Sequence, residues 1–415
     1  MKWIRPSEIK GRIQAPASKS LMIRASAAAA LGLGESLIRN PSFCDDALAG
    51  LRLAEGLGAL VRRTGDGVRI EGGTGRVSSF VNCGESGLCM RMFAPIFALF
   101  ERETRLSGEG SLLSRPMRML ELPLAEMGVE VGTKDGYPPL AIRGPIRTGS
   151  VRIDGSLSSQ FLTGLLMALP LFPEDSQLRV DGLKSRPYAA LTISLLARFG
   201  ISIEADPGFS HFQIKGGQSY RSIEYRVEGD WSGAAFILAA AAVRGEATVE
   251  NLRPDSLQAD RRVLEALRAA GAELILREDS VTVRRRDLKA FDFDAADCPD
   301  LFPPLAALAL NCAGTSRIFG VGRLKHKESD RAAVLFEELS GLGAAIAIRE
   351  DVLEVARSRI RGGTLDAHND HRIAMAGALA GLASESGVRV EGAECVAKSY
   401  PRFFEDLESL GGDIS

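Results

Sequence analysis

A repeat of about seventy residues is the feature that most constrains the fold of this chain. In each repeat a helical pattern ends at a glycine, after which apolar and polar residues alternate as in a half-buried strand. The glycines are Gly58, Gly128, Gly200, Gly271, Gly343 and Gly411, spaced 68 to 72 residues apart. Six repeats account for the 415 residues, a length that exceeds one hydrophobic core and predicts two domains.

Turns and additional helices complete the repeats. Glycine- or aspartate-containing turns separate pairs of short strands at residues 65–67, 134–136, 206–208 and 350–351. Most repeats contain a second, more apolar helical stretch, at residues 91–100, 160–169, 231–243, 304–310 and 371–382. The pattern predicts an α/β fold of six βαβαββ units, three in each domain about a pseudo-threefold axis. A doubly wound nucleotide-binding fold would show no such internal period.

Composition excludes several classes of protein. The 51 basic residues are balanced by 53 acidic ones, which argues against a nucleic-acid partner. The four histidines and six cysteines form no metal-ligand spacing, so we expect no metal and reduced, mostly buried thiols. The N-terminus lacks a signal-peptide pattern, and the longest apolar run, 234–243, is too short to span a membrane. We therefore expect a cytoplasmic protein with no membrane partner.

Basic and hydroxyl side chains recur where helices are expected to begin. Ser18 is a candidate N-cap for a helix through the alanine run 25–30, which places Lys19 and Ser20 in its first turn. Arg24 falls on nearly the same helix face as Ser20. A helix N-terminus with these groups favours an anion, and the alternative is a capped helix with solvated charges.

Two further segments in the first half of the chain combine an arginine with a backbone that could help to bind an anion. Gly87 lies in a Gly-Ser-Gly loop that opens a helix containing Arg91, and glycine lets a ligand approach the backbone closely. Arg115 precedes Pro116, which holds the arginine backbone extended. Gly-Ser turns and surface Arg-Pro pairs are also common without any ligand, so each segment is weak by itself.

Hydroxyl groups gather before two other helices. Ser156, Ser158, Ser159 and Gln160 precede an apolar helix, and Ser185 stands before a second one. Simple capping needs one hydroxyl group, so three of them with an amide favour a site for an anion or a polyol.

The second half of the chain supplies carboxylates. Asp300 stands between two prolines in apolar company, where we expect a raised pKa, the alternative being a turn or capping aspartate. Around Lys327 and Arg331 the favoured interpretation is a solvated helix with i,i+3 ion pairs, Lys327 to Asp330 and Glu328 to Arg331. Against it, Lys327 and Arg331 would share one face of like charge, which a bound polyanion would relieve.

Single charged residues mark three more helix starts or ends. Asp230 is expected to be only an N-cap, Arg372 opens an apolar helix, and Lys398 lies near the C-terminus. Taken together, cations and hydroxyl groups at inner-helix N-termini would create a field for small polyanions, and the few acids would then transfer protons.

These residues, in this order, resemble the 5-enolpyruvylshikimate-3-phosphate synthase family of the enolpyruvyl transferases over essentially the whole chain. The matching segments are Ser18-Lys19-Ser20 with Arg24, Ser86-Gly87 with Arg91, Arg115-Pro116-Met117, residues 154–161, 327–331 and 369–372, and Ala397-Lys398. The resemblance implies two domains of three βαβαββ units, 18–227 and 1–17 with 228–415, joined by two crossings and closing over substrate. It implies a monomer that needs no metal or organic cofactor.

The implied reaction transfers a carboxyvinyl group from phosphoenolpyruvate to the 5-hydroxyl of shikimate 3-phosphate, by addition and then elimination of phosphate. The proton-transfer residues implied are Asp300 as base, Glu328 beside the methylene, and Lys19, with their division of roles open. Those implied for shikimate 3-phosphate are Lys19, Ser20, Arg24, Ser158, Ser159, Gln160, Ser185, Asp300 and Lys327. Those implied for phosphoenolpyruvate are Lys19, Gly87, Arg115, Gln160, Arg331, Arg372 and Lys398.

The chain departs from the family pattern at three positions. Glu85 and Leu88 flank Ser86-Gly87 where the family usually has Asn and Thr, which could alter affinity for phosphoenolpyruvate and for the inhibitor glyphosate. Arg323 stands where the family often has Asn, so a shikimate contact there is in doubt.

Two other functions compete. The sister transferase that acts on UDP-N-acetylglucosamine typically has Lys-Asn where this chain has Lys19-Ser20, and a reactive-cysteine loop that is not found near Arg115. A non-catalytic anion-binding protein could retain the fold, but Asp300, Glu328 and Lys19 are all present. Both alternatives are therefore less favoured.

Overall fold

The computed structural model describes residues 1–73, 75–147 and 149–415. Contacts between residues divide the chain into two units, Ala17–Val227 and Met1–Pro16 with Glu228–Ser415. Ala17 belongs to the Ala17–Val227 unit, one residue from the boundary expected from the sequence.

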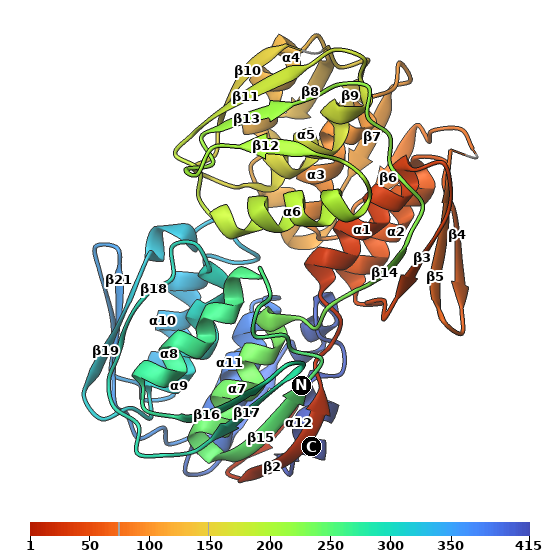
Figure 1. The fold of residues 1–415 in the computed structure, drawn as a ribbon. Coiled ribbons are helices and arrows are strands. Elements are labelled where there is room, and N and C mark those ends of the chain that lie inside the picture. Colours follow the sequence, from red (N-terminus) through yellow and green to blue (C-terminus); the bar gives the residue numbers. More distant parts are fainter. Residues whose placement is uncertain (74, 148) are drawn as a thin grey trace. The chain divides into compact units, whose positions relative to one another are not determined.

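The Ala17–Val227 unit contains three repeats of the same elements (Figure 1). The first comprises β14 (Glu224–Arg226), α1 (Lys19–Leu31), β3 (Gly34–Arg39), α2 (Asp45–Gly56), β4 (Leu60–Thr64) and β5 (Gly67–Gly72). The second comprises β6 (Phe80–Asn82), α3 (Gly87–Phe97), β7 (Thr104–Ser107), the 3-10 helices η1 (Gly110–Ser114) and η2 (Arg118–Leu120), α4 (Glu121–Glu126), β8 (Glu130–Lys134) and β9 (Tyr137–Arg143). The third comprises β10 (Ser150–Asp154), α5 (Gln160–Ala168), η3 (Leu169–Leu171), β11 (Ser176–Asp181), α6 (Arg186–Arg198), β12 (Ile203–Ala205) and β13 (His211–Ile214).

The other unit also contains three repeats. The first comprises β2 (Ile9–Gln14), α7 (Trp231–Arg244), β15 (Gly245–Glu250), η4 (Ala259–Arg262), α8 (Val263–Ala269), β16 (Glu273–Arg277) and β17 (Ser280–Arg284). The second comprises β18 (Asp292–Asp294), η5 (Pro299–Leu301), α9 (Phe302–Ala309), β19 (Thr315–Phe319), η6 (Val321–Arg323), α10 (Arg331–Gly341), β20 (Ile346–Arg349) and β21 (Val352–Ala356). The third comprises β22 (Gly363–Asp366), α11 (His371–Ala383), β23 (Val388–Glu391), η7 (Ala393–Lys398), α12 (Phe403–Ser409), β24 (Asp413–Ile414) and β1 (Lys2–Arg5).

Each repeat forms one four-stranded sheet, and the strand order is the same in all six sheets, as in β6-β7-β9-β8. The first two strands of a repeat are parallel, and the last two pair antiparallel, the fourth strand also pairing with the second. In five repeats the last two strands form a hairpin, whereas β24 and β1 come from opposite ends of the chain. The predicted βαβαββ architecture is confirmed. Three strands come from distant parts of the chain: β14 pairs with β3, β2 with β15, and β1 with β23.

The six repeat glycines end six helices, as predicted. Each lies two residues beyond the last helical residue, with φ between +79° and +108°. After α2, the Gly58 N–H donates to Glu55 O at 2.9 Å and the Ala59 N–H donates to Ala54 O at 3.2 Å. The same pair of bonds follows α4, α6, α8, α10 and α12, and it satisfies the last carbonyls of each helix. Glycine is favoured because a side chain would be strained at this φ.

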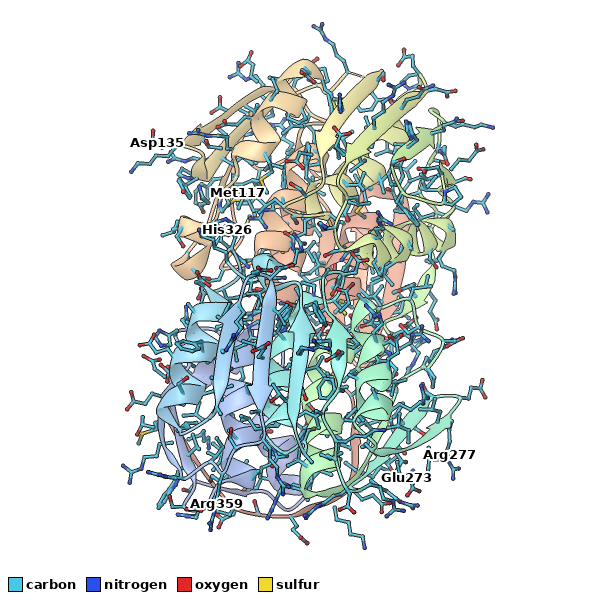
Figure 2. All side chains as sticks on the ribbon, turned by 90° about the vertical axis from the view of Figure 1, so that its left-hand side faces the viewer. Met117, Asp135, Glu273, Arg277, His326 and Arg359 are labelled. Atoms are coloured by element: carbon cyan, nitrogen blue, oxygen red, sulfur yellow. The ribbon has the colours of Figure 1, made fainter. Side chains whose placement is uncertain are left out.

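The predicted turns are also present. Residues 65–66 join β4 to β5, and residues 350–351 join β20 to β21. Asp135 has φ +55° and projects from the tip of the turn between β8 and β9 (Figure 2). Aspartate tolerates this left-handed conformation better than most residues do, which accounts for its place in the turn.

The helices of each unit fall into two classes. The helices α3, α5, α7, α9 and α11 are buried nearly all round, and α7, α9 and α11 pack on one another (Figure 1). A helix that is apolar on every face needs such a central place. Helices such as α2 and α10 bury one face only. Arg277 and Arg359 project from the outer surface of their unit (Figure 2).

All six cysteines are buried, as expected, and no disulfide joins them in the described structure. Burial raises the pKa of the Cys83 thiol to about 12. None of the described helices combines the length and the apolar character needed to cross a membrane.

Candidate active site

Most of the predicted site residues lie at or just before the starts of helices, whereas Arg115 follows the end of η1 and Lys398 is the last residue of η7. In the Ala17–Val227 unit they accompany α1, α3, α5 and α6, and in the other unit they accompany α9, α10, α11 and η7. We refer to Asp300, Lys327, Glu328, Arg331, Asp370 and Arg372 as the carboxylate–guanidinium cluster.

Helix α1 begins at Lys19, with Ser18 at the N-cap position as predicted. The Ser18 hydroxyl does not cap the helix, however, and its oxygen is buried with no hydrogen-bond partner in the described structure. Lys19 Nζ lies 2.8 Å from a carboxylate oxygen of Asp46, which α2 contributes. Both side chains are largely buried. The start of α1 therefore combines an ion-paired lysine with one buried hydroxyl group that makes no hydrogen bond in the described structure.

Arg24 is a buried cation held by neutral groups. Its Nε donates to Thr192 Oγ1 at 3.0 Å, and its Nη1 donates to Ser20 Oγ at 2.5 Å. No described carboxylate pairs with it, and burial lowers its pKa to about 10. A bound anion near Ser20 would therefore supply the charge that the protein itself does not.

Gly87, Arg91 and Arg115 converge at the start of α3. Ser86 caps this helix by accepting from the Cys89 N–H. A Cβ atom built on Gly87 would lie 2.8 Å from Arg115 Nη1 and 3.6 Å from Arg91 Nη1. Only a glycine leaves both guanidinium groups this close to the backbone. The extended conformation predicted for Arg115 is confirmed, with φ −87° and ψ 131°.

The start of α5 is joined to α3. Arg91 Nη1 donates to Gln160 Oε1 at 3.0 Å, and the Gln160 N–H donates to Ser158 Oγ at 3.2 Å. Ser159 is buried at the N-cap position and does not cap the helix with its side chain. Ser185 precedes α6 in the left-handed conformation, with φ 57° and ψ 43°. A non-glycine residue in this conformation is typical of functional sites.

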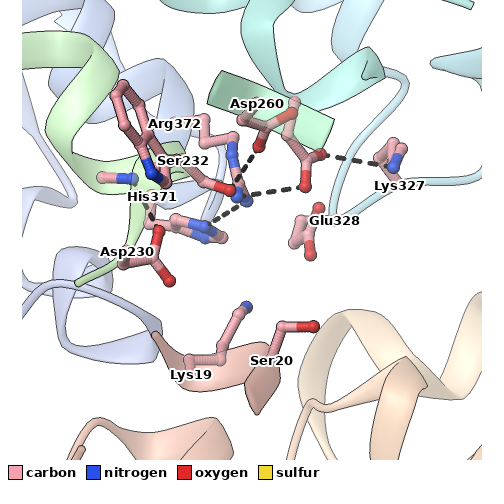
Figure 3. Close-up of polar contacts among 12 residues, drawn as sticks. Lys19, Ser20, Asp230, Ser232, Asp260, Lys327, Glu328, His371 and Arg372 are labelled. Carbon is pink, nitrogen blue, oxygen red and sulfur yellow. Dashed lines mark hydrogen bonds and ion pairs between the residues drawn. The ribbon is translucent and has the colours of Figure 1, made fainter. Parts of the chain in front are cut away.

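Arg331, fully buried, is the centre of the carboxylate–guanidinium cluster in the other unit. Its Nε lies 2.9 Å from Asp370 Oδ2, and its Nη1 lies 2.9 Å from Asp300 Oδ1. Its Nη2 pairs with Glu328. Asp300 also receives Lys327 Nζ at 3.2 Å and Arg372 Nη2 at 3.1 Å (Figure 3). Three cations therefore surround one carboxylate.

The raised pKa expected for Asp300 is wrong. Burial by itself raises the pKa of this carboxyl, but the charges of Arg372, Lys327 and Arg331 hold it well below the usual range. The three cations come from positions far along the chain, so the residues next to Asp300 could not reveal them. Asp300 is ionised at neutral pH.

This shift predicts how stability depends on pH. A depressed pKa contributes stability above the unfolded-state pKa of about 3.9, and that contribution is lost as the pH falls through the folded-state pKa. At pH 6 we expect the unfolding free energy of wild type to be larger than that of Asp300→Asn. The difference between the two should become smaller below pH 4. Urea unfolding at several pH values measures this difference in unfolding free energy. Asp279→Asn, at an exposed aspartate, is the control. A gap that widens on acidification would contradict the assignment.

The ion-pair helix expected at residues 327–331 is also wrong. Helix α10 begins at Arg331, Asp330 is its N-cap, and residues 325–330 precede it in irregular structure. The predicted pair of Glu328 with Arg331 is present, whereas Lys327 pairs with Asp300. Aspartate is a strong N-cap, so the helix begins after it and Lys327 turns toward Asp300.

Arg372 and Lys398 accompany the start of α11. Asp370 caps this helix through the Arg372 N–H, while Arg372 Nη1 lies 2.6 Å from His371 Nε2. Lys398 Nζ donates to Asn369 O at 2.6 Å. The expectation that Arg372 opens an apolar helix is confirmed, as is the capping role of Asp230, which accepts from the Gly233 N–H.

Four residues of these surroundings had no binding or catalytic role assigned from the sequence, although Arg91 and Asp370 lie in the segments that resemble the family. The four are Asp46, Arg91, Asp260 and Asp370. Asp260 hydrogen-bonds Ser232, and burial together with the charge of Asp300 raises its pKa to about 7. Asp370 had one usable signal, its position before an apolar helix. Asp46 and Asp260 had none, because their partners lie 27 and 28 residues away.

The three departures from the family pattern have distinct surroundings. Glu85 accepts from the Ser111 N–H at 2.8 Å and from the Ser111 hydroxyl at 2.9 Å. Leu88 belongs to the hydrophobic core of its unit. Arg323 is half-buried near Asp297 and Asp300, and burial lowers its pKa. In the part of the chain that the structure describes, no group of His, Cys, Asp or Glu could hold a metal ion.

Comparison with known proteins gives the family. The family model for EPSP synthase (3-phosphoshikimate 1-carboxyvinyltransferase) matches residues 4–407. The chain belongs to the EPSP synthase family. A 3-phosphoshikimate 1-carboxyvinyltransferase from Methanocorpusculum labreanum is 40% identical over 98% of both chains. One from Aeropyrum pernix is 38% identical over 99% of this chain and 96% of its own.

Solved structures agree on the fold. An EPSP synthase from Acinetobacter baumannii is 25% identical, with a TM-score of 0.84 over 100% of this chain and 99% of that one. The enolpyruvyl transferase NikO from Streptomyces tendae is 19% identical, with a TM-score of 0.80 over 100% of this chain and 98% of its own. The second likeness concerns the fold alone. The resemblance stated from the sequence is confirmed.

Proposed function

We propose that this EPSP synthase family member transfers the enolpyruvyl group of phosphoenolpyruvate to the 5-hydroxyl of shikimate 3-phosphate and releases phosphate. The observation that carries the proposal is the family match over residues 4–407, with relatives of that activity up to 40% identical along 98% of the chain. The reaction belongs to the shikimate pathway to chorismate and the aromatic amino acids.

For substrate binding, the proposal assigns the phosphate and carboxylate groups of the two substrates to the basic and polar residues described above. Shikimate 3-phosphate would contact Lys19, Ser20, Arg24, Ser158, Ser159, Gln160, Ser185, Asp300 and Lys327. Phosphoenolpyruvate would contact Lys19, Gly87, Arg115, Gln160, Arg331, Arg372 and Lys398. Arg24 supports the first set, because it is buried without a carboxylate among the described residues. The closeness of Gly87 to Arg115 supports the second set, because a carboxylate or phosphate can approach backbone and guanidinium together.

For proton transfer, the proposal assigns Asp300, Glu328 and Lys19. The 5-hydroxyl oxygen bonds to C2 of phosphoenolpyruvate while its proton leaves to a base, and C3 gains a proton to give a tetrahedral intermediate. C3 then loses a proton as the C2–O bond to phosphate breaks. Asp300 is ionised and can take the hydroxyl proton. When substrate anions attract Lys327 and Arg372, the pKa of Asp300 rises and it becomes a stronger base.

The same proposal covers the domains, the oligomeric state, the location and the absence of a cofactor. Residues 18–227 and 1–17 with 228–415 would act as the two domains of a cytoplasmic monomer that uses no metal or organic cofactor. Turnover would require residues of both. Size-exclusion chromatography with light scattering tests the monomer, and activity after exhaustive chelation tests the absence of a metal.

Phosphate release from phosphoenolpyruvate tests the function directly. Release with shikimate 3-phosphate and none with UDP-N-acetylglucosamine is the expected result. Release with UDP-N-acetylglucosamine alone would show that the acceptor is the nucleotide sugar and not shikimate 3-phosphate, and would leave the fold assignment unchanged. Absence of release with either acceptor would favour an anion-binding protein without catalysis.

Gly87→Ala should weaken phosphoenolpyruvate binding without unfolding the protein. The new Cβ would lie 2.8 Å from Arg115 Nη1, the end of a flexible side chain, so the guanidinium moves and the backbone does not. Displacing a binding group by a fraction of an ångström is expected to raise the KM for phosphoenolpyruvate about tenfold, since 1 Å can cost about 100-fold. Steady-state kinetics with each substrate varied measures this effect.

The control for this prediction is Gly65→Ala, because a Cβ on Gly65 meets no atom within 4 Å. We expect this variant to match wild type in both KM values. A Gly87→Ala variant that raised the KM for shikimate 3-phosphate instead would contradict the assignment of Gly87.

A further inference from the structure

We propose that Glu85 is a positioning residue that couples the loop bearing Gly87 to the loop bearing Arg115 and thereby sets the affinity for phosphoenolpyruvate. This inference rests on the proposed function, and it assigns a role to a residue where the chain departs from the family pattern. In this role Glu85 acts through Arg115 and Gly87 and needs no contact with substrate.

The two loops are joined along their length. The Glu109 N–H donates to Gly84 O at 2.8 Å, and Asn82 Nδ2 donates to Glu109 Oε1 at 2.5 Å. Glu85 adds a further link, since its Oε2 accepts from both the N–H and the hydroxyl of Ser111. This link lies two residues before Gly87 and four residues before Arg115. Beyond the two loops, Arg91 Nη2 of α3 donates to Pro116 O at 3.1 Å.

The carboxylate also stabilises the start of η1. The first N–H groups of a 3-10 helix have no partner within it, and Glu109 at the N-cap position does not cap with its side chain. Glu85 therefore caps η1 from another loop, and a charged acceptor makes such a bond short and strong. Gly110, with φ +49°, makes room for it, because a Cβ there would overlap the Glu85 carboxylate.

The consequence concerns Arg115, which follows η1 directly. The position of its guanidinium at Gly87 depends on how η1 sits against residues 82–87. Loss of the Glu85–Ser111 link should free η1 and let Arg115 move from Gly87. The opposite effect would follow if Glu85 acted mainly as a negative charge that repels phosphoenolpyruvate, so the two interpretations predict changes of opposite sign.

Steady-state kinetics of Glu85→Ala and Glu85→Gln distinguishes the two interpretations. We expect Glu85→Ala to raise the KM for phosphoenolpyruvate about tenfold, with kcat and the KM for shikimate 3-phosphate within about twofold of wild type. Glu85→Gln keeps an oxygen that accepts both Ser111 bonds, and should restore most of the affinity. A KM that falls in both variants, or does not change in either, overturns the proposal.

Glu103→Ala is the matched control. Glu103 is an exposed carboxylate of the same unit that pairs with Arg143, so this variant removes the same charge without touching either loop. We expect its KM for phosphoenolpyruvate to match wild type. A rise equal to that of Glu85→Ala would point to a general charge effect and overturn the proposal.

Hydrogen exchange supplies a measurement that does not depend on activity. In the substrate-free protein, Glu85→Ala should speed exchange of the Ser111 amide at least tenfold, whereas Glu103→Ala should not. Unchanged exchange at Ser111 would overturn the coupling even if the enzyme is active. Conversely, an inactive wild-type protein with faster exchange in Glu85→Ala would refute the proposed function and leave the loop coupling intact.

Discussion

Replacing Lys19 with methionine should abolish turnover while both units stay folded. Lys19 is the one residue that the proposed function places in both substrate sets and among the proton-transfer groups. Loss of a proton-transfer group costs about 10²- to 10⁴-fold in rate, so we expect kcat to fall by a factor in this range. Methionine keeps the length and apolar stem of the side chain and removes its charge. Phosphate release with shikimate 3-phosphate measures the loss.

The ion pair of Lys19 with Asp46 calls for a second variant, because the methionine leaves a largely buried carboxylate without this partner. Lys19→Met with Asp46→Asn removes both charges, and should recover stability without recovering activity. Lys215→Met, an exposed lysine of the same unit, is the control and should remain active. Full activity in Lys19→Met would refute the site assignment.

Arg331→Met should destabilise its unit by about 3–5 kcal/mol, the cost of breaking a buried ion pair by removing one partner. Arg331 is fully buried, and Asp370, also fully buried, would lose its guanidinium partner. Asp300 and Glu328 would each lose one cation. Both tryptophans, Trp3 and Trp231, belong to this unit, so urea unfolding followed by tryptophan fluorescence reports on it selectively.

Two variants separate this effect from a general loss of charge. Arg331→Met with Asp370→Asn should regain part of the lost stability, because no buried carboxylate is then left without its partner. Arg317→Met breaks an exposed pair with Asp292 and should cost less than about 1 kcal/mol. Equal destabilisation by Arg331→Met and Arg317→Met would show that burial of the carboxylate–guanidinium cluster does not add to the free energy lost when an ion pair is broken.

The sequence by itself determined the repeat and its elements. A left-handed glycine two residues beyond a helix is a local requirement, since the hydrogen bonds that end the helix join residues at most five positions apart. The same holds for the turn at Asp135 and for the caps Asp230 and Ser86. Lys19, Gly87 and Arg372 could likewise be placed at helix starts, because their own neighbours define those starts.

Only the tertiary structure decided the electrostatics. The pKa of Asp300 depends on Lys327, Arg331 and Arg372, which lie 27 to 72 residues away in sequence and surround it only in the folded unit. Two large opposing effects, burial and positive charge, act on that carboxyl, and the adjacent prolines indicate only the first.

The link between Glu85 and Ser111 spans 26 residues and was likewise invisible in the sequence. The pairing of β14 with β3 and of β1 with β23 was also decided by the folded chain. Local rules fix where elements begin and end, whereas the state of a charge depends on every group that folding brings near it.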